Sequence, residues 1–203
     1  MRIDHVIYGV HDLDVAAARL NADHELGFVR GGHHPGGTAN SIAPLEPPQY
    51  LELIAVADPV GEPAQMIQRW MDGEERLVGW AIEPDDLDAV ATRLGLEPFV
   101  GSIENPNGST GTWRIVGHAT DNAYPFFIEY DGDADVRRRR WAERRAESGN
   151  NWVRAITFVE VGAAADSMRA WIGDDTIPVR CLAGEQGVLA VGLATEKGEI
   201  VIR

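Results

Sequence analysis

The stretch IDHVIYGVHDLDVAAARL, residues 3–20, has a close counterpart in LVGWAIEPDDLDAVATRL, residues 77–94. In both copies an apolar, strand-like run precedes Asp-Leu-Asp, and a helical run ends on Arg-Leu. Asp12 and Asp86 open the two helical runs, where an aspartate side chain can cap free backbone N–H groups. Each copy continues through turns into further strands, the last of them strongly apolar. The repeat therefore predicts two consecutive β-α-β-β-β modules and an α+β fold.

The repeat also predicts how the chain divides. Residues 1–75 form module one and residues 76–132 form module two of a single unit, and residues 133–151 form an Arg-rich helical linker. Residues 152–203 repeat the order of strand, helix and strands in a shorter form. We expect an additional βαβββ-like half-module there. We assign it to packing or dimerisation rather than to chemistry.

Composition excludes several classes of protein. The 203 residues are 44% hydrophobic, which is enough for one core and a second, smaller one. No apolar run approaches the roughly 18 residues of a membrane span, and strand-like sequence begins at once, so we expect a cytoplasmic protein with no membrane partner. The single cysteine, Cys181, fits a reducing compartment. A net charge of −14 argues against nucleic acid and leaves a small molecule as the expected partner, with a homodimer as an option.

A basic run stands out in this acidic chain. Four consecutive arginines occupy residues 137–140, and Arg144 and Arg145 follow. They alternate with Trp141 and with glutamates, a pattern typical of a surface helix. We interpret the run as a solvated face or as a partner in intramolecular ion pairs, in preference to an anion-binding site.

Two apolar, strand-like runs each contain one glutamate. YLELIAV at residues 50–56 contains Glu52, and FFIEY at residues 126–130 contains Glu129. Burying a carboxylate costs several kcal/mol, on the order of 3–5, unless it is paired, protonated or bound to a metal. We therefore predict that both glutamates mark the functional site.

His5 belongs with these glutamates by its place in the first strand. Because residues two apart in a strand face the same way, His5 shares a face with Ile3 and Ile7. If the helices cover one face of the sheet, the other face curls into a cup where His5, Glu52 and Glu129 meet. One imidazole and two carboxylates suit a divalent metal that keeps open positions for substrate. The alternative is a hydrogen-bonded network of the same groups without a metal.

Four segments together resemble a known family. They are the Ile-Asp-His-Val opening with its Asp-Leu-Asp, GGHHPGGTANSI at residues 31–42, YLELI at residues 50–54 and PFFIEY at residues 125–130. In these the chain resembles glyoxalase-like domain proteins of the vicinal oxygen chelate superfamily. The resemblance covers most of residues 2–132 and implies paired βαβββ modules that form a cup-shaped mixed sheet. Residues 152–203 resemble an extension common in that group.

The resemblance also implies metal ligands on the first and last strands of each module. Residue by residue, it gives His5 and Glu52 as ligands from module one and Glu129 from module two, with both glutamates also as catalytic residues. The metal would be a divalent ion of zinc, nickel, manganese or iron. Trp80 stands where glyoxalase I-like enzymes place a histidine or glutamate. Either three protein ligands suffice, or Trp80 marks a site that has lost its metal.

Five further residues are candidates for binding a substrate. His34 and Asn40 lie in a Gly/Pro-rich loop, where they could bind a substrate oxygen or, for His34, shuttle a proton; equally, they could satisfy local backbone groups. Trp80 and Trp113 are candidate stacking walls of the cup. Arg114 either binds a substrate carboxylate or faces outward as a surface arginine.

Two functions remain open on this basis. The first is a metal-dependent enzyme of isomerase, lyase or dioxygenase type, acting on a small oxygen-rich substrate, in which Glu52 or Glu129 moves a proton. The second is a metal-free cup that binds or sequesters an organic ligand, or uses acid–base groups alone. His5 and the two glutamates favour the first function, and Trp80 favours the second.

Overall fold

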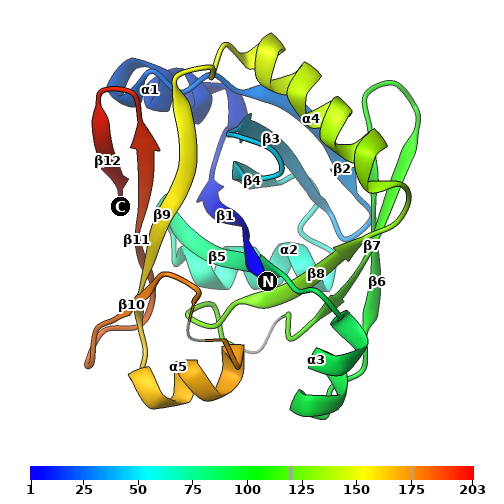
Figure 1. The fold of residues 1–203 in the computed structure, drawn as a ribbon. Coiled ribbons are helices and arrows are strands. Elements are labelled where there is room, and N and C mark those ends of the chain that lie inside the picture. The colour runs from blue at the N-terminus through cyan, green and yellow to red at the C-terminus, as the bar shows by residue number, and fades with distance from the viewer. Residues whose placement is uncertain (119–120, 175) are drawn as a thin grey trace.

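The computed structural model describes residues 1–118, 121–174 and 176–203 (Figure 1). Both predicted modules are present, each with the order strand, helix and three strands. Module one consists of β1 (Arg2–Val10), α1 (Leu13–His24), β2 (Val29–His34), β3 (Thr38–Pro44) and β4 (Tyr50–Val56). Module two consists of β5 (Arg76–Glu83), α3 (Leu87–Leu94), β6 (Phe99–Glu104), β7 (Thr110–Val116) and β8 (Phe126–Tyr130).

The two module helices begin at the aspartates that the sequence indicates. Asp12 accepts hydrogen bonds from the backbone N–H groups of Asp14 and Val15, at 2.9 and 3.0 Å. Asp86 accepts one from Ala89 at 2.9 Å. An additional helix, α2 (Glu62–Met71), joins the modules and is not part of the repeat. Its sequence signal was a proline in the first turn followed by apolar residues at helical spacing.

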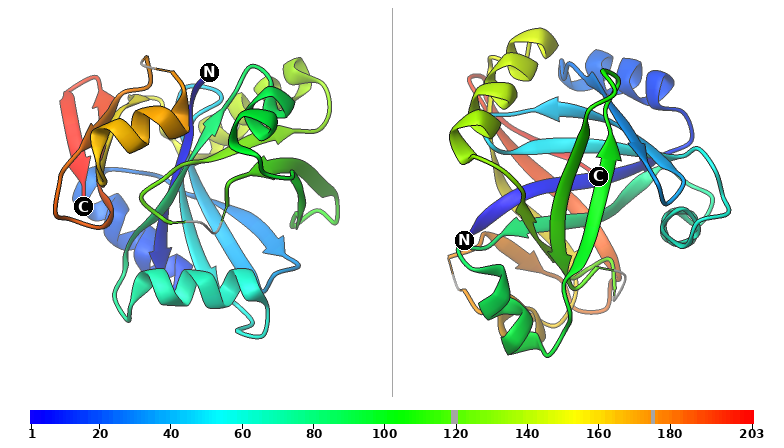
Figure 2. Two further views of the ribbon diagram at one scale, coloured as in Figure 1. Left: turned by 90° about the horizontal axis from the view of Figure 1, so that it is seen from below. Right: turned by 90° about the vertical axis from the view of Figure 1, so that its right-hand side faces the viewer.

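The eight strands of the modules close into a barrel, in the order β1-β4-β3-β2-β6-β7-β8-β5. In each module the first and last strands pair in parallel, β1 with β4 and β5 with β8. The modules join along the antiparallel pair β1 and β5, and at a single residue pair, His33 with Glu104, between β2 and β6. The predicted α+β fold with a cup-shaped mixed sheet is confirmed, and Figure 2 shows the cup from two further directions.

The main hydrophobic core lies outside the barrel. Strand residues that point outward, such as Val6, Leu51, Trp80 and Phe127, pack with the helices and the C-terminal sheet. Their neighbours in sequence point inward and line a cavity. Alternation along each strand thus separates a packed outer layer from a hollow interior.

The C-terminal residues form a second, four-stranded sheet against one side of the barrel, beside β5 (Figures 1 and 2). Its elements are β9 (Val153–Gly162), α5 (Ala165–Ile172), β10 (Val179–Cys181), β11 (Gly187–Thr195) and β12 (Gly198–Ile202). The order of elements is the predicted one, but β9 pairs in parallel with β10, the next strand, and not with the last. The domain boundaries of the sequence analysis stay a prediction.

Helix α4 (Ala134–Ser148) occupies the Arg-rich segment and lies across β2 and β3 (Figure 1). Within the described ranges, every helix is too short or too polar to span a membrane.

Trp80 gives a test of this arrangement. Its side chain is fully buried in the outer core and its indole N–H donates to the carbonyl of Ala123 at 2.9 Å. We expect Trp80→Ala to lower the free energy of unfolding by about 3–5 kcal/mol in urea titrations, and Trp80→Phe by less. Val60→Ala, at a 79% exposed position, is the matched control and should change it by less than about 0.5 kcal/mol. Loss of ligand affinity in Trp80→Phe at unchanged stability would contradict the outward placement.

Candidate functional site

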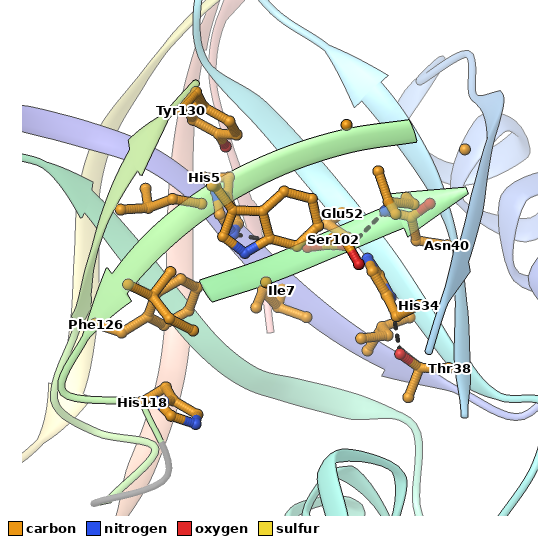
Figure 3. Close-up of a pocket in the computed structure, with 18 of the residues that line it drawn as sticks. His5, Ile7, His34, Thr38, Asn40, Glu52, Ser102, His118, Phe126 and Tyr130 are labelled. Atoms are coloured by element: carbon orange, nitrogen blue, oxygen red, sulfur yellow. Dashed lines mark hydrogen bonds and ion pairs between the residues drawn. The ribbon is translucent and has the colours of Figure 1, made fainter. Parts of the chain in front are cut away.

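A cavity of about 860 Å³ fills the barrel interior and is lined by strands of both modules and by α4. Its walls are mainly apolar and aromatic, with contributions from Tyr50, Trp113, Phe126, Tyr130 and Trp141. His5 and Glu52 lie side by side on one wall (Figure 3). A mostly apolar cavity with a few convergent polar groups is the usual form of a small-molecule site.

A β-bulge at the start of β1 sets the position of His5. The pairing of β1 with β5 shifts register between Ile3 and His5, so that Asp4 becomes the extra residue. A bulge re-aims side chains, and here Asp4 turns back to its neighbour. The Oδ2 atom of Asp4 lies 2.7 Å from Nδ1 of His5. Asp4 is wholly buried and His5 is 3% exposed, so this contact is shielded from water.

Two tyrosines extend the contact. The hydroxyl of Tyr130 donates to the same Oδ2 of Asp4 at 2.7 Å, and the hydroxyls of Tyr50 and Tyr130 lie 2.8 Å apart. Burial, together with the charge of Asp4, raises the pKa of both phenols well above the ordinary value. Both tyrosines therefore stay protonated near neutral pH. Because Tyr130 gives its proton to Asp4, the proton of Tyr50 points to Tyr130.

Glu52 is held from the opposite side. Its Oε1 accepts a hydrogen bond from the side-chain amide of Asn40 at 2.7 Å, and the amide oxygen of Asn40 accepts one from the backbone N–H of Gly32 at 2.8 Å. A Cβ atom at Gly31 would come within 1.8 Å of that amide oxygen. The two glycines of the 31–42 segment thus let Asn40 reach the backbone and orient the carboxylate.

His5 and Glu52 face each other at the edge of the cavity (Figure 3). Their Nε2 and Oε2 atoms are 3.6 Å apart, which is an ion-pair distance and too long for a hydrogen bond. Because Asp4 contacts Nδ1, Nε2 is the ring atom that meets Glu52.

His34 lies farther along the same wall. Its Nδ1 is 2.8 Å from the hydroxyl of Thr38, and its ring packs edge-on against Trp113 with centroids 5.9 Å apart (Figure 3). Burial lowers the pKa of His34, and the charge of Glu52 opposes this only in part. His34 is therefore neutral near pH 7.

The structure does not bring Glu129 to His5 and Glu52, contrary to the expected convergence. Ile128 and Tyr130 line the cavity, so Glu129 points outward by alternation along β8. Its Oε2 accepts from Nε and Nη2 of Arg114, at 2.9 and 2.5 Å, and Arg114 also pairs with Asp88 at 2.9 Å. Arg114 is thus an outward arginine held by two carboxylates, which together raise the pKa of its guanidinium.

The register explains why the second half of the expected ligand set is missing. His5 pairs with Tyr50 across β1 and β4, and Ala81 pairs with Phe126 across β5 and β8. Ala81 is therefore the module-two counterpart of His5, and by the same offset Ile128 is the counterpart of Glu52. Trp80 and Glu129, assigned to these places from the sequence, are each one residue out of register. Trp80 lies in the outer core and is no wall of the cup.

These residues do not fit the metal site that the resemblance implies. Such a site takes ligands from both modules, but the module-two positions that correspond to His5 and Glu52 are Ala81 and Ile128, and neither can bind a metal. Across the described residues, no group of three or more histidine, cysteine, aspartate or glutamate side chains is arranged to hold a metal ion. We derive no step through a metal.

Several site residues had little signal in the sequence. Asp4 depends on the bulge, and Tyr50 and Tyr130 gave no sign of their hydroxyl pair. Trp141 stacks on Tyr50 with centroids 4.9 Å apart, and Tyr50 stacks on His5 at 4.5 Å. The Arg-rich run is interpreted above as a solvated or ion-paired face, and Arg137 and Arg138 do form ion pairs, with Glu83 and Asp135. Arg138, Arg139 and Arg140 are exposed, while Arg137, Arg140 and Arg144 also line the cavity.

A family model described as "Glyoxalase-like domain" matches residues 3–174. The chain belongs to this glyoxalase-like family. The predicted resemblance is thereby confirmed, whereas no curated protein matches the chain.

Solved structures share the fold of this glyoxalase-like protein at low identity. A hypothetical protein from Staphylococcus aureus is 16% identical with a TM-score of 0.67, over 98% of this chain and 84% of that one. A methylmalonyl-CoA epimerase from Streptomyces coelicolor, in complex with 2-nitronate-propionyl-CoA, is 16% identical with a TM-score of 0.48, over 66% of this chain and 99% of that one. The first likeness shows the fold.

The lowered pKa of His34 predicts a pH dependence of stability. The unfolded chain binds a proton at this histidine below about pH 6.5, where the folded chain does not, so stability is lost as pH falls through that range. We expect the urea midpoint of the wild type to fall more between pH 8 and pH 5 than that of His34→Gln. Parallel pH curves for the two proteins would contradict the buried, neutral His34.

Proposed function

We propose that this glyoxalase-like protein is an enzyme that moves a proton at a carbon atom next to an oxygen-bearing carbon of a small organic substrate, with no resident metal. The observation that carries the proposal is the close approach of His5 and Glu52 at the wall of a mainly apolar cavity, with the buried Asp4 behind His5. The reaction is of isomerase or lyase type. The predicted catalytic role of Glu52 is retained, and that of Glu129 is not.

Glu52 is the proposed base. Asn40 holds its Oε1, which leaves Oε2 free to face the cavity and His5. A carboxylate fixed in this way loses little freedom when it takes a proton from carbon. Its position beside an apolar wall also strengthens its electrostatic interactions with a bound substrate.

His5 is the proposed stabiliser of the anion. In the proposed reaction, His5 carries a proton on Nε2 and donates a hydrogen bond to a substrate carbonyl that reaches this atom. The C–H proton then passes to Oε2 of Glu52, the electron pair of the C–H bond moves onto the carbonyl oxygen, and the N–H of His5 stabilises the enolate. Return of the proton from Glu52 to carbon completes an isomerisation.

Asp4 and the two phenols position His5. The contact with Asp4 fixes the ring through Nδ1, so that Nε2 faces the cavity. Tyr130 compensates part of the cost of burying the carboxylate of Asp4. Asp4, Tyr50 and Tyr130 are thus positioning residues.

Hydrogen–deuterium exchange tests the reaction without knowledge of the natural substrate. A panel of small ketones, keto acids and thioesters in D₂O is followed by proton NMR for exchange next to the carbonyl. We expect the wild type to catalyse exchange of at least one compound, and Glu52→Gln to lower that rate by about 10²–10⁴-fold. Glu129→Gln removes a carboxylate of the barrel that lies outside the cavity, and it should leave the exchange rate within about twofold of the wild-type rate.

A rate in Glu129→Gln that falls as far as in Glu52→Gln would contradict the assignment of the base. The second candidate function is a binding protein without catalysis, which the aromatic walls of the cavity favour. Ligands that bind the wild type and Glu52→Gln equally, with no exchange in either, would support that function over the enzyme.

Addition of divalent ions tests the metal-free form of the proposal. We expect zinc, nickel, manganese and iron(II), each added to chelator-treated protein, to leave the melting temperature within about 1 °C, because His5 and Glu52 are not joined by a third ligand among the described residues. His5→Ala serves as the comparison. A rise of several degrees in the wild type that His5→Ala abolishes would restore the metal-dependent hypothesis.

A further inference from the structure

One face of α4 brings arginines into the cavity. Arg137, Arg140, Trp141 and Arg144 follow at intervals of three, one and three residues and so share a side of the helix. All four line the cavity. Arg138 lies on the exposed side, where it pairs with Asp135. In a chain with a net charge of −14, this concentration of positive charge at the cavity is a distinct feature.

The arginines of this face differ in their partners. Arg137 is paired with Glu83 and stacks over the ring of Tyr130 at 4.7 Å. Arg144 lies over Trp141 at 5.6 Å, and its contact with the side-chain oxygen of Asn105 is long, at 3.5 Å. Burial lowers the pKa of Arg144, although the charge of Glu147 opposes this. Within the described residues, Arg140 has no ion pair and no hydrogen bond.

Acidic groups that face the same part of the cavity are engaged elsewhere. Asp131 accepts a hydrogen bond from the hydroxyl of Thr112 at 2.5 Å. Asp133 caps α4, accepting from the backbone N–H groups of Asp135 and Val136 at 2.8 and 3.0 Å. Both lie before the first turn of α4, whereas Arg140 and Arg144 lie in its middle and last part. The guanidinium groups of these two arginines are therefore left without a carboxylate in direct contact.

Aromatic rings connect α4 with His5. Trp141, Tyr50 and His5 form a continuous stack, with centroid distances of 4.9 and 4.5 Å. An apolar surface thus runs from the arginines to the proposed reactive pair. A planar guanidinium group binds carboxylate, phosphate or sulfonate oxygens through paired N–H donors.

We propose that the cavity takes an organic anion whose charged group binds Arg140 and Arg144 of α4 and whose apolar body lies over Trp141 and Tyr50 toward His5. This inference rests on the proposed function for the identity of the reactive end, but the anion site itself does not depend on catalysis. The substrate class is an organic acid or phosphate ester with an apolar body and a carbonyl group at the far end from its charge.

Two fluorescent dyes with the same ring system test the anion site directly. 1-Anilinonaphthalene-8-sulfonate carries a negative charge, and N-phenyl-1-naphthylamine is its uncharged counterpart. We expect the sulfonate to bind the wild type more tightly. Arg140→Gln with Arg144→Gln should weaken sulfonate binding by at least about tenfold and change the uncharged dye by less than about threefold. Raising the salt concentration should reduce the difference between the dyes.

Arg138→Gln with Arg139→Gln is the matched control, because it removes the same charge from positions that do not line the cavity. Equal losses in this control and in the cavity variant, or equal affinities of the two dyes for the wild type, would overturn the anion site. Glu52→Gln separates the two proposals. If Glu52→Gln loses exchange activity but the two dyes bind the wild type equally, the anion site is wrong and the proposed enzyme activity is supported. If the sulfonate binds more tightly but no compound exchanges, the anion site is supported and the proposed enzyme activity is wrong.

Discussion

The site depends on the burial of Asp4. Its carboxylate is wholly enclosed, and such a charge is tolerated only with partners that offset its loss of water. His5 and Tyr130 are those partners, and both approach one oxygen, Oδ2, while Oδ1 has no hydrogen bond to any residue that the structure describes. The need to satisfy this carboxylate ties β1 of the first module to β8 of the second. It also fixes the imidazole so that Nε2 meets Glu52 at the cavity wall.

The two modules contribute different kinds of residue to the site. Module one supplies the polar groups: His5 from β1, Glu52 from β4 and Asn40 from β3. Module two presents an apolar wall at the equivalent register positions, with Ala81 and Ile128 where module one has a histidine and a glutamate. The duplicated architecture therefore carries a one-sided site. One imidazole and one carboxylate that face each other at the cavity wall suit acid–base chemistry better than they suit multidentate coordination of an ion.

The repeat predicted the fold because its signals are local: Asp-Leu-Asp at each helix start, and strands of the right length between turns. The same reasoning found Glu52 and His5 but misplaced Glu129. Alternation along a strand tells which residues share a face, but it does not tell which face is inside. That choice is usually made by hydrophobicity, and here both faces of β8 carry apolar residues, since Phe127 packs in the outer core and Ile128 lines the cavity. Asp4 was beyond reach because a bulge, which leaves no mark in the period of the sequence, turns it toward His5.

Helix α4 forms one wall of the cavity and makes the two ends of the cavity chemically different. The Arg-rich run has charged residues around most of its circumference, so its hydrophobic pattern could not show which side packs against the barrel. The position of Trp141 shows which side of α4 packs against the barrel, because its ring stacks on Tyr50. Arg140 and Arg144, on the same side of the helix, therefore line the cavity. Positive charge then lies at the helix, and His5 and Glu52 lie at the other end of the ring stack. A ligand with charge at one end and a reactive carbonyl at the other satisfies both ends at once, and the apolar walls between them exclude water from the reacting carbon.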